Sequence, residues 1–315
     1  MSLPLKQFNV VIIGFGRAGK ARLSSLHQLG QTHFSIVTKR PQEVDNFIKL
    51  KELEHLTVFV LQDWQKVLSE STVQTVFICS ENHLHYEQVR YALEQKKHVC
   101  VEFPLCVSLN QAEELYALAH HKNSVLHVEC IGTLTSRHQE LKSLVQDQQI
   151  KRLEFDFTGS LYRWLIDEVK AKRFAELSFG RLYQCIDLFA GLQVLDVDLA
   201  QESDVKTPLA YVLKLELGVH YKDDAPIKIQ IIEHRKLEAQ RSSQVHAYSA
   251  HGLIPLAPMQ RSSLFLLDSQ HFFALVEHRD QESKLKSDDR YIPNYALKDK
   301  VLTTYALIQK VNHLL

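Results

Sequence analysis

Three glycines near the N-terminus constrain the fold of this chain more than any other feature of its sequence. Phe8–Ile13 is a short, apolar run rich in β-branched residues, and an amphipathic stretch covers Lys20–Leu29. A Gly-x-Gly-x-x-Gly turn between a strand and a helix is typical of dinucleotide-binding domains, where the pyrophosphate lies at the helix N-terminus. The first glycine permits the tight turn, the second admits the pyrophosphate, and the third lets helix and strand pack closely. We therefore predict a cofactor-binding turn formed by Gly14, Phe15, Gly16, Arg17, Ala18 and Gly19.

Six apolar, strand-like segments alternate with helix-like segments over the first 130 residues. The strands are expected over 8–13, 34–37, 57–61, 73–79, 98–102 and 125–129, and the helices over 20–29, 43–53, 64–68, 85–95 and 109–121. Fully apolar strands that alternate with helices are typical of a parallel sheet covered on both faces. We predict an α/β protein with an N-terminal Rossmann parallel sheet, and we assign residues 1–130 to this NAD(P)-binding domain.

The pattern changes after residue 130. Leu153, Phe155 and Phe157 alternate with polar residues, which indicates a strand with one buried face. Further strands are expected over 194–199, 209–219, 227–234, 244–250 and 263–267, and helices over 134–144, 168–188 and 298–314. We predict that residues 131–315 form an α+β domain for substrate binding or oligomerisation, with a mostly antiparallel sheet that is open on one face. The C-terminal helix is expected to pack back on the first domain.

Composition excludes several classes of protein. Lys and Arg total 37, as do Asp and Glu, so the basic excess of a nucleic-acid-binding protein is missing. No apolar run approaches the roughly 20 residues of a membrane span. The five cysteines include no C-x-x-C pair, which favours free thiols in a reducing compartment and no metal site. We expect a cytoplasmic protein that binds neither nucleic acid nor membranes.

The end of the second expected strand bears on the choice of cofactor. NAD-selective domains place Asp or Glu about 20 residues after the glycines, where it binds the ribose 2′-hydroxyl. Here Thr38, Lys39 and Arg40 occupy that position. A hydroxyl and two cations suit a 2′-phosphate. The sequence therefore predicts NADPH, with NADH as the alternative.

Further candidates follow the fourth and fifth expected strands. Parallel sheets bind ligands at the carboxyl ends of their strands. The residues expected near the nicotinamide are Ser80, Glu81, Asn82, His85, Glu102 and Phe103.

Together these residues resemble the glucose–fructose oxidoreductase/inositol dehydrogenase (Gfo/Idh/MocA) family. That family has Glu-Lys-Pro after the fifth strand and Asp-x-Gly-x-His-x-x-Asp on a later helix. Here the first motif reads Glu102-Phe103-Pro104, and Gln184 stands three residues before Asp187, where the family has His. Oxidation of an alcohol by hydride transfer needs a base, and neither Phe103 nor Gln184 can be one.

The biliverdin reductase branch of the family fits this combination better. Glu102-Phe103-Pro104 is similar to its Glu-Tyr-Pro, and residues 126–130 (Leu-His-Val-Glu-Cys) are similar to its Leu-His-x-Glu-His. Arg181 precedes Leu188-Phe189 by seven residues, as an arginine of that branch does. The resemblance implies hydride transfer from NADPH to the central methine of a bilin, which gives bilirubin.

The resemblance also implies roles for individual residues. Arg181 would stabilise the charge that develops on the bilin, and Glu102 would order the nicotinamide. Phe103, Arg181 and Arg261 would bind the bilin, which would lie against the open face of the second sheet. A homodimer formed through that sheet is a competing use of the same surface. Two alternatives stay open: a related oxidoreductase acting on a sugar or a small imine, and a non-catalytic NAD(P)-binding regulatory protein.

Overall fold

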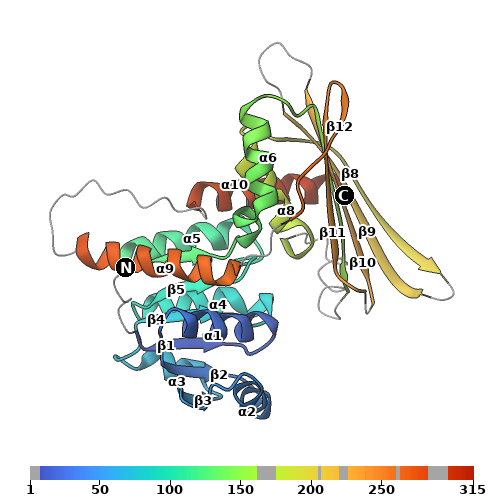
Figure 1. Cartoon of the computed structure of the whole chain (residues 1–315). Helices are drawn as coiled ribbons and strands as arrows, with labels where there is room; N and C mark the ends of the chain where they lie inside the picture. The colour runs from blue at the N-terminus through green and yellow to red at the C-terminus, as the bar shows by residue number, and fades with distance from the viewer. Residues whose placement is uncertain are drawn as a thin grey trace. The chain divides into compact units, whose positions relative to one another are not determined.

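The chain forms two compact units (Figure 1). The computed structural model describes residues 8–161, 175–204, 207–219, 226–237, 239–259, 263–282 and 297–315. The first unit contains Met1–Ile131 and Ser262–Leu297, and the second contains Gly132–Arg261 and Lys298–Leu315. No helix in the described ranges is both long and apolar enough to cross a membrane.

The first unit is built on a six-stranded parallel sheet in the order β3-β2-β1-β4-β5-β6. Its strands are apolar because helices cover both faces, and β1 and β4 are buried along their whole length. The predicted Rossmann sheet is confirmed. The strands are β1 (Val10–Ile13), β2 (His33–Val37), β3 (Thr57–Leu61), β4 (Thr75–Ile78), β5 (His98–Val101) and β6 (Leu126–Val128). The first five helices are α1 (Arg17–Gln28), α2 (Pro41–Leu50), α3 (Trp64–Ser69), α4 (Asn82–Glu94) and α5 (Leu109–His121).

One helix of the first unit comes from much later in the chain. The strand expected at 263–267 is wrong, because this run is the first turn of α9 (Leu264–Glu282). Phe272, Phe273 and Val276 are fully buried, at a spacing that only a helix brings to one face. Phe273 stacks on Phe8 with ring centroids 4.9 Å apart, and Phe272 meets Phe77 edge-on. The first unit therefore includes a segment that the sequence assigned to the second domain.

The second unit contains a six-stranded sheet in the order β12-β11-β7-β10-β9-β8. Neighbouring strands are antiparallel except for the β7–β10 pair, so the predicted mostly antiparallel sheet is confirmed. The strands are β7 (Arg152–Ser160), β8 (Gln193–Asp204), β9 (Thr207–Val219), β10 (Ile227–Lys236), β11 (Ser242–Ser249) and β12 (Gly252–Ile254).

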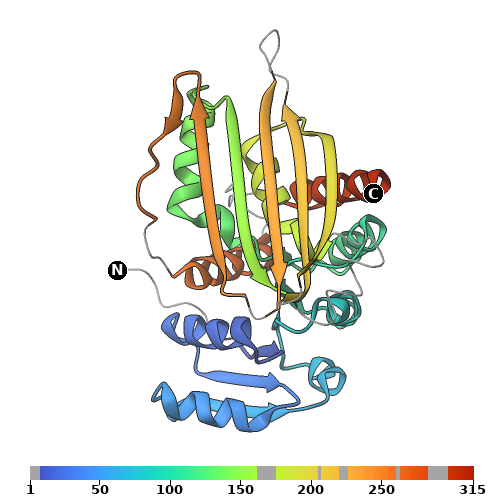
Figure 2. The same cartoon turned by 90° about the vertical axis from the view of Figure 1, so that its right-hand side faces the viewer.

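Helices cover one face of this second sheet. In Figure 2 the bare face is turned toward the viewer, with α6 (Ser136–Gln146), α8 (Ala175–Leu188) and α10 (Lys298–Leu314) behind it. Leu153, Phe155 and Phe157 point toward the helices and are buried, as their alternation predicts. The C-terminal helix α10 belongs to the second unit.

Candidate functional site

The glycine turn has the geometry that a dinucleotide requires. Gly14 has φ = +90°, and a Cβ there would lie 2.5 Å from the carbonyl oxygen of Cys79. Only glycine fits such a position. A Cβ on Gly16 would meet nothing within 4 Å, and no side chain caps the first turn of α1. Free N–H groups at a helix N-terminus beside open space suit a pyrophosphate. The residues present therefore fit the predicted cofactor.

The other residues of the turn differ in exposure. Phe15 is buried and meets Phe47 edge-on. Gly19 is buried and close to the backbone of Gly14, as helix–strand packing requires. Ala18 is half-buried and Arg17 is exposed at the start of α1.

Two cations pair with one carboxylate near the end of β2. Thr38 is buried, and its Oγ1 accepts the N–H of Arg40 at 3.1 Å. Arg40 Nη1 lies 2.6 Å from Glu43 Oε1, and Lys20 Nζ lies 3.0 Å from Glu43 Oε2. The hydrogen bond from Lys20 and the charge of Arg40 lower the pKa of Glu43. With Lys39 exposed beside them, the local charge is positive.

The residues after β4 hold the strand ends together. Ser80 donates to Gln88 Oε1 at 2.6 Å. His85 is buried, with Nδ1 2.8 Å from the carbonyl oxygen of Pro104 and Nε2 3.2 Å from that of Ser80. Burial lowers the pKa of His85. Its contacts therefore connect the β4 and β5 ends. Glu81 is exposed and directly precedes α4, which starts at Asn82.

Glu102 belongs to a buried ionic network that the sequence reasoning missed. Arg22 on α1 is fully buried, and its Nε and Nη2 donate to Glu102 Oε1 at 3.1 and 3.0 Å. The same guanidinium contacts Asp268 on α9 and donates to Ser269 Oγ at 3.2 Å. His127 Nε2 lies 2.7 Å from Asp268 Oδ1. An arginine inside an otherwise amphipathic helix was the one available signal for this network.

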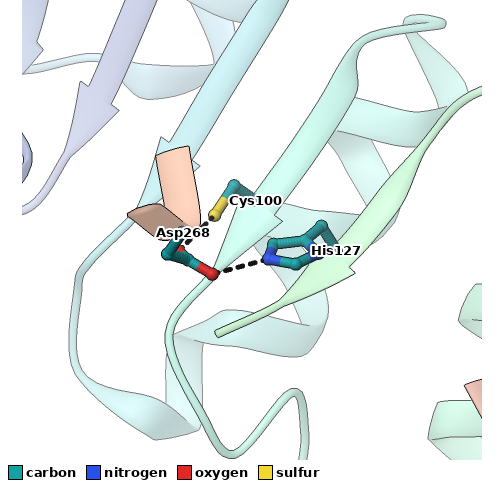
Figure 3. Close-up of side chains that lie close together, drawn as sticks. All are labelled: Cys100, His127 and Asp268. Atoms are coloured by element: carbon teal, nitrogen blue, oxygen red, sulfur yellow. Dashed lines mark hydrogen bonds and ion pairs between the residues drawn. The ribbon is translucent and has the colours of Figure 1, made fainter. Parts of the chain in front are cut away.

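Part of this network has side chains that ligate metals. Cys100, His127 and Asp268 lie together in Figure 3, with Sγ of Cys100 3.9 Å from Asp268 Oδ2. Burial raises the pKa of the Cys100 thiol well above its usual range, so without a metal ion it is a neutral thiol. Burial also acts to raise the pKa of Asp268, but the charges of Arg22 and His127 outweigh it and lower that pKa. Arg22 thus provides the positive charge that a metal ion would bring.

Arg181 lies between α8 and the second sheet. Its guanidinium carbon is 3.7 Å from the centroid of the buried Phe157 ring, and its side chain is 12% exposed. Nε of Arg181 is 3.7 Å from Glu233 Oε1, and Arg235 Nη2 is 3.1 Å from Glu233 Oε2. Burial lowers the pKa of Arg181, and Glu233 opposes that effect. Arg181 thus lies on the face of the sheet that the helices cover.

Asp187 and Gln184 follow Arg181 on α8. Asp187 pairs with three side chains. Its Oδ2 lies 2.7 Å from His138 Nε2 and 3.3 Å from Lys142 Nζ, and it also contacts Lys300. Burial acts to raise the pKa of Asp187, but these partners outweigh burial and hold that pKa well below its usual range. The amide of Gln184 fills the space where Gly132 would carry a Cβ. Phe103 is half-buried after β5, and Arg261 lies outside the described residues.

Comparison with known proteins adds to this geometry. Residues 8–130 match the model of an oxidoreductase family with an NAD-binding Rossmann fold, Gfo/Idh/MocA. Human biliverdin reductase A is 27% identical over 225 residues, which cover 66% of this chain and 72% of the human protein. The mouse protein is 26% identical over 275 residues, covering 85% of this chain and 86% of that protein. Over residues 8–130 the chain thus matches the Gfo/Idh/MocA oxidoreductase family.

The likeness to this family extends over both units. A crystal structure of biliverdin reductase from Synechocystis sp. PCC 6803, in complex with biliverdin and NADP+, matches with a TM-score of 0.71 at 18% identity. The match covers 97% of this chain and 98% of that one, and at this identity it supports the fold. The chain therefore resembles biliverdin reductases and other Gfo/Idh/MocA oxidoreductases, and residues 8–130 match the NAD-binding Rossmann fold of that family.

Proposed function

We propose that this protein is an NADPH-dependent reductase of a bilin, with biliverdin as substrate and bilirubin as product. The observation that carries the proposal is the set of contacts that the Arg181 side chain makes. Its side chain is 12% exposed, and among the described residues its guanidinium lies over the Phe157 ring and 3.7 Å from Glu233 Oε1, beyond hydrogen-bond distance. A buried cation normally has its donors paired. The guanidinium donors that the described residues leave unpaired are therefore available to a ligand.

The surroundings of Arg181 favour an anionic, conjugated ligand. Arg235 and Arg241 lie with their guanidinium carbons 4.9 and 5.4 Å from the centroid of the Phe157 ring, so three arginines gather around that ring, and two of them pair with Glu233. Such a cluster suits the negative charge that develops when hydride adds to a conjugated system, and it suits carboxylate groups such as propionates. Phe157 adds an aromatic face.

The replaced catalytic pair supports reduction over sugar oxidation. Phe103 has no proton to exchange, and the amide of Gln184 is not a base at neutral pH. When bound, the nicotinamide supplies the hydride. Gly14, Gly16 and the N-terminus of α1 hold the pyrophosphate, and Glu102 orders the nicotinamide end. The biliverdin reductases among the relatives favour the same class of substrate.

Turnover tests the proposal directly. Purified protein mixed with NADPH and biliverdin is expected to lose the red absorption of biliverdin and gain the blue absorption of bilirubin. An unchanged spectrum, with NADPH binding still visible by nicotinamide fluorescence, contradicts bilin reduction and favours a related oxidoreductase or a non-catalytic NAD(P)-binding protein. Loss of NADPH binding as well would contradict the assignment of the glycine turn.

Replacing Arg40 by alanine is expected to raise KM for NADPH about tenfold and to leave KM for NADH unchanged. A hydrogen bond to a charged group contributes roughly 1.5 kcal/mol at the low end of its range, which suits an exposed arginine. Initial rates with each cofactor check this. Arg90→Ala is the matched control, because Arg90 is an exposed helix arginine that pairs with Glu94 at 3.3 Å. Equal effects on both cofactors would contradict a 2′-phosphate site near Arg40.

A further inference from the structure

Glu129 is a buried carboxyl group without a cationic partner. It directly follows β6, and its backbone N–H donates to the carbonyl oxygen of Val101 at 2.8 Å. The residue is 1% exposed, and its Oε1 accepts the N–H of Ile131 at 2.8 Å. No lysine, arginine or histidine among the described residues pairs with it. A buried carboxylate without a cation is costly, whereas a buried carboxylic acid is not.

The charges around Glu129 also favour its protonated form. Glu102 on the neighbouring strand end and Asp268 on α9 already share the one guanidinium of Arg22. An ionised Glu129 would be a third carboxylate beside a single arginine. Burial, and then the charge of Glu102, raise the pKa of Glu129 well above its usual range.

The other titratable groups of this region do not reverse that balance. His127 on β6 is bound to Asp268. Burial raises the pKa of the Cys79 thiol at the end of β4 well above its usual range, so it adds no charge at neutral pH. These surroundings therefore favour the protonated form of Glu129 at the carboxyl edge of the parallel sheet, which is where such sheets bind their ligands.

We propose that Glu129 is the general acid of the reaction, an inference that rests on the proposed reduction of a bilin. Addition of hydride to the methine carbon forms one C–H bond and brings two electrons into the conjugated system. That charge ends on a pyrrole nitrogen, which must take up one proton. Glu129 gives this proton from its carboxyl group as the N–H bond forms, and the carboxylate that remains is reprotonated from water before the next turnover.

Other residues are poorer donors of this proton. Arg181 keeps its proton because the pKa of a guanidinium is above about 12. Phe103 has none to give. Burial raises the pKa of Glu102, but Glu102 accepts two N–H bonds from Arg22, which oppose that rise and which Glu129 lacks. A positioned acid contributes about 10²- to 10⁴-fold to a rate, so the effect of removing it is measurable.

Glu129→Gln tests this proposal, because glutamine has the shape of the protonated acid and donates no proton. We expect kcat for biliverdin to fall about 100-fold, at the low end of the range for general acids, with NADPH affinity unchanged. In the wild type kcat should fall as pH rises through the pKa of Glu129, since only the acid donates. The variant should lose that dependence. Glu113→Gln, at an exposed position on α5, should behave as the wild type.

Infrared difference spectra provide a readout that needs no turnover. The free wild-type protein should show the carbonyl band of a protonated carboxyl group, and Glu129→Gln should lack it. A variant with wild-type kcat and pH profile would overturn the proposal and leave water as the donor, as would the absence of that band from the wild type. If the wild type itself does not reduce biliverdin, the proposed function is overturned, and the role of Glu129 with it.

Discussion

Arg181→Met is expected to lower kcat for bilin reduction by about 10²- to 10³-fold, the usual effect of removing one group that stabilises charge in a transition state. Methionine keeps most of the volume between α8 and Phe157, so the fold should persist. The cofactor turn lies in the other unit, so NADPH affinity should not change. Steady-state kinetics with biliverdin and nicotinamide fluorescence check both parts. Arg181→Lys should recover part of the rate, since a charge remains.

The second sheet offers a matched control for this substitution. Arg152 also has its guanidinium over an aromatic ring, 3.9 Å from the centroid of Tyr248, and lies 3.3 Å from Glu154. It is exposed on the first strand of that sheet. Arg152→Met should therefore leave kcat and KM unchanged. Equal kinetics for the Arg181 and Arg152 variants, with only the melting temperature lowered at Arg181, would make Arg181 a structural residue.

The periodic parts of the fold were predictable because their signal is local. Each parallel strand is a short apolar run between helices, and β7 shows its buried face as a simple alternation from Leu153 to Phe157. The helix α9 was not predictable in this way. Its first turn is an apolar run at Leu264–Leu267, and its membership of the first unit depends on Phe272 and Phe273 meeting aromatic residues from far earlier in the chain.

In the candidate site, too, local features were predictable from the sequence and contacts between distant residues were not. The turn from Gly14 to Gly19 was predictable, since its spacing reports a backbone geometry that few other residues allow. The direction of Arg181 was not, because a helix position does not say which face of a sheet its side chain meets. The network of Arg22 and Asp268 was missed for the same reason. Arg22 and Asp268 are buried charges that stabilise each other, and the sequence does not show this pairing because they are far apart in it.

Replacing Arg22 alone by methionine is expected to destabilise the protein by about 3–5 kcal/mol, as loss of one partner of a buried ion pair usually does. The substitution leaves Asp268 fully buried and Glu102 partly buried without their cation. Urea unfolding, followed by circular dichroism, measures the change. Arg90→Met, which breaks an exposed pair with Glu94, should cost less than about 1 kcal/mol.

A second substitution separates an unpaired charge from lost packing. Arg22→Met with Asp268→Leu should be more stable than Arg22→Met alone, because the buried carboxylate is gone. No recovery would mean that the arginine stabilises the protein through packing and not through its charge.

The free energy of unfolding measured at acidic pH gives an independent check. The pKa of Asp268 is lowered in the folded protein, so its contribution is present at neutral pH and is lost as pH falls through the acidic range. Without Arg22 that loss should shrink, while the share due to Asp187, whose partners are His138, Lys142 and Lys300, should remain.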